Sequence, residues 1–497
     1  MIPPTDRREL VKALLTLGIP IALQSLVGSS LNLLDSLMIG SLGTARIAGV
    51  ALANQVFFIL NLFLFGVGSG AGVFVAQYWG GRDIAGIRRS LGACLVLTLA
   101  GAGLFFVFGQ AAPGAILSLF TADPVVISQG ASFLRICSAG FLFQAVSASF
   151  TYVLRSTERT RMPLVASSLS LAVNTFLNWV LIFGRFGLPA LGVEGSAIAT
   201  VTARFLEMAI VLGAVYARRG RRGTGRGGNA HPAGAHAARQ PAAAHIRELL
   251  AFDLAFLGRY LKVILPVVGN EVGWAVGLAV EAAVFGRMGT GAIASYSMAD
   301  TAAKLVIVVF FGIVNASAIV VGKRIGQGDR AGAMHAASFY ARLAPFSGLG
   351  LGLILAVCSR FVPSLFNVEP EVRAGAALAM IIYGCVLPLR LFNWQVIVGV
   401  LRAGGDTLFS LAMDLGGTWL IGLPLAAVAG LVLGAPFWLV YLLTLTEDLP
   451  KVVLGTLRMR SGKWLNDLTA RAAPAPEARA GAGAGVAGAG AGPGTPV

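Results

Sequence analysis

The side chains best placed to do chemistry are a few polar and ionisable residues inside long apolar runs. Asp35 lies in the first such run, one turn after Asn32, and a second run places Ser170, Asn174 and Asn178 on one helix face. A carboxylate facing amides offers hard oxygen ligands, which suit a small cation or a shared proton. An ionisable group at a helix centre in a bilayer costs about 2.5 to 3.5 kcal/mol, so it needs a partner or a function. We therefore expect an ion or proton site at Asp35, with hydrogen bonding between helices as the structural alternative.

Acidic residues in the second half of the chain are candidates for contact with a substrate. Glu271 and Glu281 lie in the apolar run 260–287, whose cations, Lys262 and Arg287, are near its ends. Glu271 is closer to the helix middle and is the better candidate for an acid that faces a substrate. Asp414 lies near the start of a span, where an interfacial position would explain it.

Two further acids have a basic residue on the same helix face. Asp300 precedes Lys304 by four residues, and Arg204 precedes Glu207 by three. Pairs at these spacings can neutralise each other along one helix. The sequence predicts a structural role for both pairs, although Asp300 stays a candidate for the wall of a substrate cavity.

Motifs for enzymatic chemistry do not emerge from the sequence. There is no HExxH, no Gly-x-Ser-x-Gly, no P-loop and no paired-aspartate diphosphate motif. The cysteines lie in apolar runs without metal-ligand spacing, so we expect no cofactor or resident metal. Transport driven by an ion gradient remains, and the sequence predicts that the protein is not an enzyme.

The composition indicates a membrane protein. Of 497 residues 56% are hydrophobic and only 12% are charged, against about 25% charged in soluble domains. Apolar runs of 18 or more residues, each long enough to cross a bilayer, recur along nearly the whole chain. The net charge of +16 comes from short basic clusters between these runs, which favours topology signals over nucleic-acid binding.

We expect an all-α integral membrane protein with about twelve transmembrane helices in two pseudo-symmetric six-helix bundles. The predicted helices lie near residues 13–41, 47–78, 90–111, 127–154, 163–184 and 194–217 in the first bundle, and near 260–287, 292–322, 336–359, 374–401, 408–431 and 435–457 in the second. The predicted divisions are an N-terminal segment 1–12, a first lobe 13–217, a basic and mostly disordered linker 218–259, a second lobe 260–457 and a tail 458–497 that is disordered from about 472.

Basic residues between the spans predict the orientation. With twelve spans, the clusters Arg7–Lys12, Arg82–Arg89, Arg155–Arg161 and the arginines of the linker share the side of both termini. Lys and Arg near span ends are retained in the cytoplasm. We therefore expect both termini to be cytoplasmic, in the inner membrane of a bacterium.

An internal repeat relates the two halves. The segment Gly43-Thr-Ala-Arg-Ile-Ala48 recurs as Gly289-Thr-Gly-Ala-Ile-Ala294, an offset of 246 residues. The same offset, or 247 for the last pair, relates Gly80 to Gly326, Asp83 to Asp329, Pro20 to Pro266 and Arg155 to Arg402. Six spans return the chain to its starting side, so the halves are expected to be parallel bundles that face each other across a central site.

The order of several motifs resembles the multidrug and toxic compound extrusion (MATE) family. These motifs are NLLDSLMIGSLGT around Asp35, VAQYWGGRD, VLRSTERTRMP, NTFLNWVLIFGRFGLPALGVEGSAIAT and VLRAGGDT, and the resemblance covers roughly residues 10–465. It implies a two-lobed antiporter, expected to act as a monomer, which exports small amphipathic and often cationic compounds in exchange for sodium ions or protons.

The resemblance also implies a set of site residues. The cation site of the family falls on Asp35, Asn174, Asn178, the backbone carbonyl of Gly192 and the hydroxyl of Ser196. Some branches of the family carry a second aspartate where this chain has Asn178. One formal charge with amide, hydroxyl and carbonyl oxygens favours sodium here. The candidates for the substrate cavity are Glu271, Glu281, Asp300 and Asn32.

Two alternatives stay open at this point. A lipid-linked saccharide flippase can share the architecture, and we would expect several arginines in its cavity to bind pyrophosphate; the candidates are Arg135, Arg204 and Arg390. A membrane-embedded enzyme is the other, and it would need a metal or diphosphate motif of the kind that is missing above.

Overall fold

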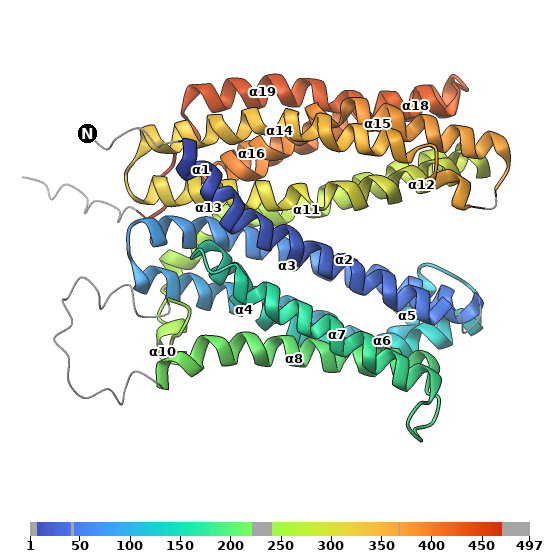
Figure 1. Ribbon diagram of the computed structural model, residues 1–497, viewed down its shortest axis with the longest axis horizontal. Coiled ribbons are helices and arrows are strands. Elements are labelled where there is room, and N and C mark those ends of the chain that lie inside the picture. The colour runs from blue at the N-terminus through green and yellow to red at the C-terminus, as the bar shows by residue number, and fades with distance from the viewer. Residues whose placement is uncertain (1–6, 41–43, 221–240, 367, 470–497) are drawn as a thin grey trace, which may run out of the picture.

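The computed structural model describes residues 7–40, 44–220, 241–366 and 368–469. In these ranges the secondary structure is helical throughout, and the helices form two elongated bundles that lie side by side (Figure 1). We call them the N-lobe and the C-lobe. The ends of the described ranges at residues 7, 220, 241 and 469 lie at one end of both bundles, the left end in Figure 1, which we call the terminal end.

The N-lobe is built by the first half of the chain. Its elements are α1 (Arg7–Ala13), the π-helical turn η1 (Leu14–Gly18), α2 (Ile19–Gly40), α3 (Thr44–Gly80), α4 (Ile84–Ala111), α5 (Pro113–Ser118), α6 (Pro124–Ser156), α7 (Arg161–Phe183) and α8 (Gly192–Gly220).

The second half builds the C-lobe. The short helix α10 (Ile246–Leu249) precedes it and packs on α4 of the N-lobe. The elements of the C-lobe are α11 (Leu254–Met288), α12 (Thr290–Ile307), α13 (Phe310–Gly326), α14 (Arg330–Cys358), η2 (Val362–Leu365), α15 (Pro370–Val396), η3 (Ile397–Arg402), α16 (Thr407–Gly417), η4 (Thr418–Gly422), α17 (Leu423–Ala427), η5 (Val428–Val432), α18 (Phe437–Thr444), η6 (Leu445–Glu447) and α19 (Asp448–Ser461).

The predicted fold class is confirmed. In the described residues ten helices are long and apolar enough to span a membrane, and the bent pair α12 and α13 makes an eleventh candidate. The twelfth predicted span corresponds to α18, η6 and α19, which carry Glu447, Asp448 and Lys451 and are therefore less apolar. The protein is thus a multi-pass membrane protein with two helical lobes.

The eighth predicted span, 292–322, is not one straight helix. It divides into α12 and α13, which meet at an angle of 48°. α12 packs on α15 within its own lobe, whereas α13 also packs on α2 and α3 of the N-lobe. A close approach of Gly312 to Gly18, where a Cβ on Gly312 would lie 2.3 Å from the Gly18 oxygen, requires glycine at this crossing.

The internal repeat has a clear structural counterpart. Asp83 caps the start of α4 by accepting a hydrogen bond of 2.8 Å from the Gly86 N–H, and Asp329 caps α14 by accepting one of 2.8 Å from the Gly332 N–H. Side-chain capping of this kind satisfies an amide that the helix leaves unpaired. The two halves therefore begin equivalent helices with the same device.

The repeated glycines Gly80 and Gly326 meet across the boundary between the lobes. A Cβ on Gly80 would lie 2.0 Å from the Lys323 oxygen, and one on Gly326 would lie 1.8 Å from the Gln77 oxygen. The C-terminal ends of α3 and α13 therefore touch backbone to backbone at the terminal end. An ion pair of 2.6 Å between Lys323 and Glu158 adds to this contact.

Parts of the predicted linker and tail are packed against the lobes. α11 begins at Leu254, earlier than the predicted residue 260, because Asp253 caps it by accepting a 2.6 Å hydrogen bond from the Phe256 N–H. α10 packs on α4, where Glu248 pairs with Arg88 at 2.6 Å. Residues 221–240 and 470–497, which hold the rest of the predicted disorder, lie outside the described residues.

Candidate functional site

Asp35 is the centre of a polar cluster between three N-lobe helices. It lies on α2 and accepts a hydrogen bond from the side-chain amide of Asn178 on α7. The same amide nitrogen is 3.1 Å from Oδ1 of Asn174, and Nδ2 of Asn174 donates to Oγ1 of Thr200 on α8 at 3.5 Å. The structure thus brings together three of the residues that the sequence predicted and adds Thr200.

Two oxygens in this part of the N-lobe are buried without a hydrogen-bond partner among the described residues. They are Oδ1 of Asn178 and Oγ of Ser196, and both side chains are fully buried. Ser196 lies one turn before Thr200 on α8. Gly192, the first residue of α8, has a positive φ of 56°, which glycine adopts without strain. The side chain of Asn32 lies outside the described residues.

A cavity lies between the two lobes. Its volume is about 460 Å³, and its walls come from α3 and α6 on one side and from α11, α13, α15, η3 and α16 on the other. Aromatic rings make up much of the wall: Phe58, Phe65, Tyr152, Trp274, Phe311 and Trp394. Polar side chains are few, as is usual in sites for small molecules: Asn61, Gln144, Asn270, Asn315 and three charged residues.

The charged residues of this cavity are Glu271, Arg402 and Asp414. Oε1 of Glu271 accepts a hydrogen bond from Nη1 of Arg402 at 2.8 Å, and only 3% of the Arg402 side chain is exposed. Sequence analysis made Glu271 a candidate for the substrate cavity, and the structure places it in the wall of the cavity between the lobes. The sequence did not identify Arg402 as the cation that pairs with Glu271, because Arg402 lies in η3, more than a hundred residues away along the chain.

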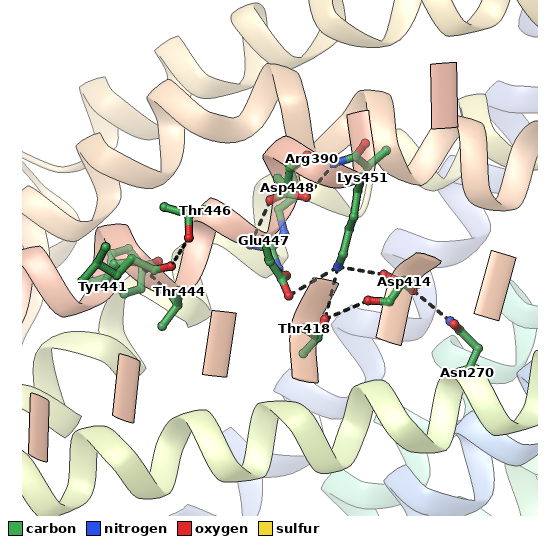
Figure 2. A network of polar contacts seen from close by, with 12 residues as sticks. Asn270, Arg390, Asp414, Thr418, Tyr441, Thr444, Thr446, Glu447, Asp448 and Lys451 are labelled. Atoms are coloured by element: carbon green, nitrogen blue, oxygen red, sulfur yellow. Dashed lines mark hydrogen bonds and ion pairs between the residues drawn. The ribbon is translucent and has the colours of Figure 1, made fainter. Parts of the chain in front are cut away.

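Asp414, in the cavity wall, belongs to a network of buried charges (Figure 2). Its two carboxylate oxygens accept hydrogen bonds of 2.9 Å, one from Lys451 and one from Asn270. Lys451 is also 3.3 Å from Glu447 and 3.2 Å from the hydroxyl of Thr418. Sequence analysis gave Asp414 an interfacial position and no partner, whereas the structure gives it polar partners from α19 and α11 inside the lobe.

The network continues to Arg390 on α15. Its guanidinium lies 3.5 Å from Glu447 and 3.8 Å from Asp448, and Asn393 donates to Asp448 at 2.8 Å. Since a buried charge is tolerated only with partners, this chain of contacts fixes α15 against α19. α19 is thus joined to α16 and α15 by charge as well as by apolar packing.

The remaining acidic candidates do not line the central cavity. Glu281 lines a separate small pocket together with Arg390 and Glu447. Asp300 pairs with Lys304 at 2.6 Å, and Arg204 pairs with Glu207 at 3.3 Å, so both predicted intrahelical pairs form.

A second polar pocket adjoins the cavity within the N-lobe. It has a volume of about 170 Å³ and shares Gln144 and Tyr152 with the central cavity. Its other polar lining includes Arg155, Arg204 and Glu207. Arg204 lies one turn after Thr200 on α8, so polar groups extend from the cavity towards the cluster at Asp35.

Sequence reasoning missed several of these residues. Arg402 and Lys451 are ordinary basic residues near span ends in the sequence, and no spacing links either to its acid. The internal repeat carried one usable signal, because Gln24 and Arg155 shift by 247 residues onto Glu271 and Arg402. None of the three arginines expected of a saccharide flippase, at positions 135, 204 and 390, lines the central cavity.

Comparison with known proteins places the chain among transporters. It is 24% identical to an uncharacterized transporter of Bacillus subtilis, YisQ, over 439 residues that cover 87% of this chain and 90% of the relative. It is 26% identical to a probable multidrug resistance protein, NorM, of Rhizobium meliloti, with 83% and 85% of the two chains covered. A crystal structure of MATE in the bent conformation shares the fold, with a TM-score of 0.79, 18% identity and coverage of 91% and 96%.

The family model called MatE matches residues 20–180 and 267–428, one segment in each lobe. The matched segments contain Asp35, Asn174 and Asn178 in the N-lobe, and Glu271, Arg402 and Asp414 in the C-lobe. Together with the fold and the cavity between the lobes, this match shows that the chain belongs to the MatE family of multidrug efflux transporters.

Proposed function

We propose that this protein is an antiporter that exports small amphipathic compounds across the cytoplasmic membrane in exchange for sodium ions or protons. The observation that carries the proposal is the cavity between the lobes, which combines six aromatic rings with a few polar groups. Such a lining binds the apolar body of a ligand through its rings and orients the ligand through its polar side chains.

The cluster at Asp35 is the proposed site of the coupling ion. A carboxylate with Asn174, Asn178, Thr200 and Ser196 nearby supplies only oxygen and amide groups, which suit a hard monovalent cation or a proton. The unpartnered oxygens of Asn178 and Ser196 are available for a cation without breaking another hydrogen bond in the described residues. We favour sodium, because a single carboxylate is present.

Coupling requires that the ion site and the cavity respond to each other. The polar pocket with Arg155, Arg204 and Glu207 shares residues with the cavity, and Arg204 lies one turn after Thr200 of the Asp35 cluster on α8. A cation bound at Asp35 would change the electrostatic balance at Arg204, which pairs with Glu207 at 3.3 Å. A ligand shifts a conformational equilibrium only when its affinity differs between the two states, and we propose that Arg204 and Glu207 provide this difference.

The orientation follows from the basic clusters at the terminal end. We propose that this end is cytoplasmic, in agreement with the retention of Lys and Arg near span ends on that side. Single cysteines at Gly220 and Pro474 should then resist membrane-impermeant thiol reagents in intact cells. Labelling of either cysteine from outside would reverse the assignment.

The decisive experiment is drug antiport in proteoliposomes, with sodium and proton gradients imposed separately. We expect export of an amphipathic dye to follow the sodium gradient in the wild type. Asp35→Asn should fold, since it keeps the shape and hydrogen bonding of the side chain, but should lose gradient-driven export. Asp300→Asn serves as the matched control, because Asp300 has its own partner in Lys304 and does not line the cavity.

Three outcomes separate the parts of the proposal. Export driven only by protons would replace sodium as the coupling ion. Equal gradient-driven export by Asp35→Asn and the wild type would remove Asp35 from the coupling site. Absence of transport and of dye binding across a chemically broad panel would contradict the export function itself.

A further inference from the structure

Two adjoining hollows follow the contact between α1 and α14 on the outer surface at the terminal end. The larger, about 650 Å³, is lined by Arg7 of α1 and by residues of α14 that include His335, Phe339, Arg342 and Phe346. The smaller, about 450 Å³, lies along α1 and η1 and also contains Arg7. Together they form one groove, which we call the α1–α14 groove.

The walls of this groove are held together by specific contacts. The hydroxyl of Tyr340 on α14 donates to the backbone oxygen of Leu10 at 3.0 Å, and Leu10 is buried in the C-lobe core. Glu9 pairs with Arg324 at 3.0 Å. α1 leads directly into the N-lobe, whereas α14 belongs to the C-lobe, and Figure 1 shows α1 lying across the boundary between them. The groove therefore joins the two lobes.

The groove carries an excess of positive charge. Arg7, Lys12 and Arg342 line it, and no acid among the described residues forms an ion pair with any of them. The acid of α1, Glu9, lines neither hollow and is paired with Arg324. α14 contains no acidic residue along its 29 positions. An anion bound here would meet no carboxylate of α14.

Beyond the basic residues both helices become apolar in the same direction. On the α1 side Leu15 and Ile19 are 53% and 50% exposed, and on α14 Phe346 and Leu349 are 71% and 59% exposed. α14 has 29 residues and is about 43 Å long, which exceeds the roughly 30 Å of the hydrocarbon core. Arg342 is about 18 Å from the start of α14 at Arg330, and a long basic side chain at this depth can extend towards the headgroup region.

We propose that the α1–α14 groove is a binding site for an anionic phospholipid. The phosphate group contacts Arg7 and Arg342, with Lys12 and His335 adding donors at its edge, and the acyl chains lie along Leu15 and Phe346. A free phosphate ion would leave the apolar half of the groove unused. A zwitterionic lipid would bring a second, positive charge against the basic residues. The lipid would bridge α1 and the C-lobe, and thereby strengthen the contact of the lobes at the terminal end.

The test compares phosphatidylglycerol with phosphatidylcholine of the same acyl chains, using native mass spectrometry of the full-length protein. The wild type should retain phosphatidylglycerol in preference to phosphatidylcholine. The double variant Arg7→Gln/Arg342→Gln should bind phosphatidylglycerol with roughly 30-fold lower affinity, since each basic residue near an anionic surface contributes about fivefold. Glycerol phosphate should not compete, because it lacks acyl chains.

The matched control is Arg161→Gln/Arg259→Gln, which removes two exposed arginines, at the start of α7 and near the start of α11, outside the groove. This variant should keep the wild-type preference. An equal loss of phosphatidylglycerol binding in both double variants would show a general effect of surface charge and would contradict a specific site in the groove. No preference for phosphatidylglycerol in the wild type would overturn it as well.

A second measurement locates the lipid. In the variant Phe346→Trp, phosphatidylglycerol with brominated acyl chains should quench the added tryptophan more strongly than brominated phosphatidylcholine at equal mole fraction. This arm leaves all the basic residues in place, so it decides the question even if the double variant fails to fold. Equal quenching by the two lipids would show that the groove does not select anionic headgroups.

Discussion

Arg402 and Glu271 form an ion pair of 2.8 Å in the C-lobe, and the shift of 247 residues that relates the two halves places Arg155 opposite Gln24 in the N-lobe. That second contact also forms, with Nη2 of Arg155 donating to Oε1 of Gln24 at 2.6 Å. The repeat thus preserves the geometry of the contact but not its charge. At this position only the C-lobe carries an acid, and Glu271 and Arg402 line the central cavity.

The pair should control which substrates the cavity accepts. Arg402→Gln leaves Glu271 without its cation, so cationic amphiphiles should bind roughly tenfold more tightly, because a nearby opposite charge is strongly attractive in a site of low dielectric. Glu271→Gln should weaken cation binding and favour anions. The measurement is quenching of the cavity tryptophans Trp274 and Trp394 by dyes matched in size.

The double variant Glu271→Gln/Arg402→Gln controls for the shape of the site. It should behave like the wild type towards neutral dyes, because both charges are removed together. Each single variant leaves a buried charge unpaired, at a cost of about 3 to 5 kcal/mol, so a lower melting temperature is expected for both. Identical dye selectivity in the two single variants would contradict an electrostatic role for the pair.

Asn178→Asp should change the ion that drives transport. The substitution keeps the size of the side chain and places a second carboxylate in contact with Asp35. Two adjacent carboxylates cannot both remain ionised without a compensating charge, so they share a proton. Antiport should then respond more to an imposed proton gradient and less to sodium. A response unchanged from the wild type would argue against direct coordination by this pair.

Lys451→Met should destabilise the C-lobe. Lys451 compensates Asp414 and Glu447, and its side chain is only 4% exposed. Removal of one partner from a buried charge network costs about 3 to 5 kcal/mol, because the other charges stay buried. The loss should appear as a lower melting temperature in detergent. Lys451→Met/Asp414→Asn should recover part of it, whereas a purely steric role would give no recovery.

Gln77→Leu should weaken the contact between the lobes at the terminal end. The Gln77 side chain donates to the backbone oxygens of Ala403 and Asn466 at 3.2 and 3.1 Å, and accepts from the Leu468 N–H at 2.8 Å. Each such hydrogen bond contributes about 0.5 to 1.5 kcal/mol, so the population that is open at this end should increase. Spin labels at Arg161 and Gln327, one on each lobe, should report a longer and broader distance.

A suitable control for this variant is Gln110→Leu. Gln110 also donates two hydrogen bonds, of 2.7 and 2.8 Å, but both stay within the N-lobe, to Arg135 and Ser138. The control should leave the distance between the labels unchanged. An unchanged distribution in Gln77→Leu as well would show that the glycine contacts alone close the terminal end.

Much of the architecture was predictable from local sequence, because apolar length and breaker residues act within a single helix. The predicted spans 47–78 and 163–184 match α3 (Thr44–Gly80) and α7 (Arg161–Phe183) to within a few residues. The repeat predicted two lobes. The spacing of Ser170, Asn174 and Asn178 along one helix predicted one face of the polar cluster. These properties depend on the order and period of residues along the chain.

The charge partners were decided only by the tertiary structure. Glu271 meets Arg402, and Asp414 meets Lys451, each from a different helix and neither at a spacing that marks the pair within one helix. The bend of 48° between α12 and α13, beyond which α13 packs on the other lobe, likewise has no counterpart in the predicted single span 292–322. The physical reason is that helix formation satisfies backbone hydrogen bonds locally in a bilayer, whereas a buried side-chain charge is compensated by whichever helix packs beside it.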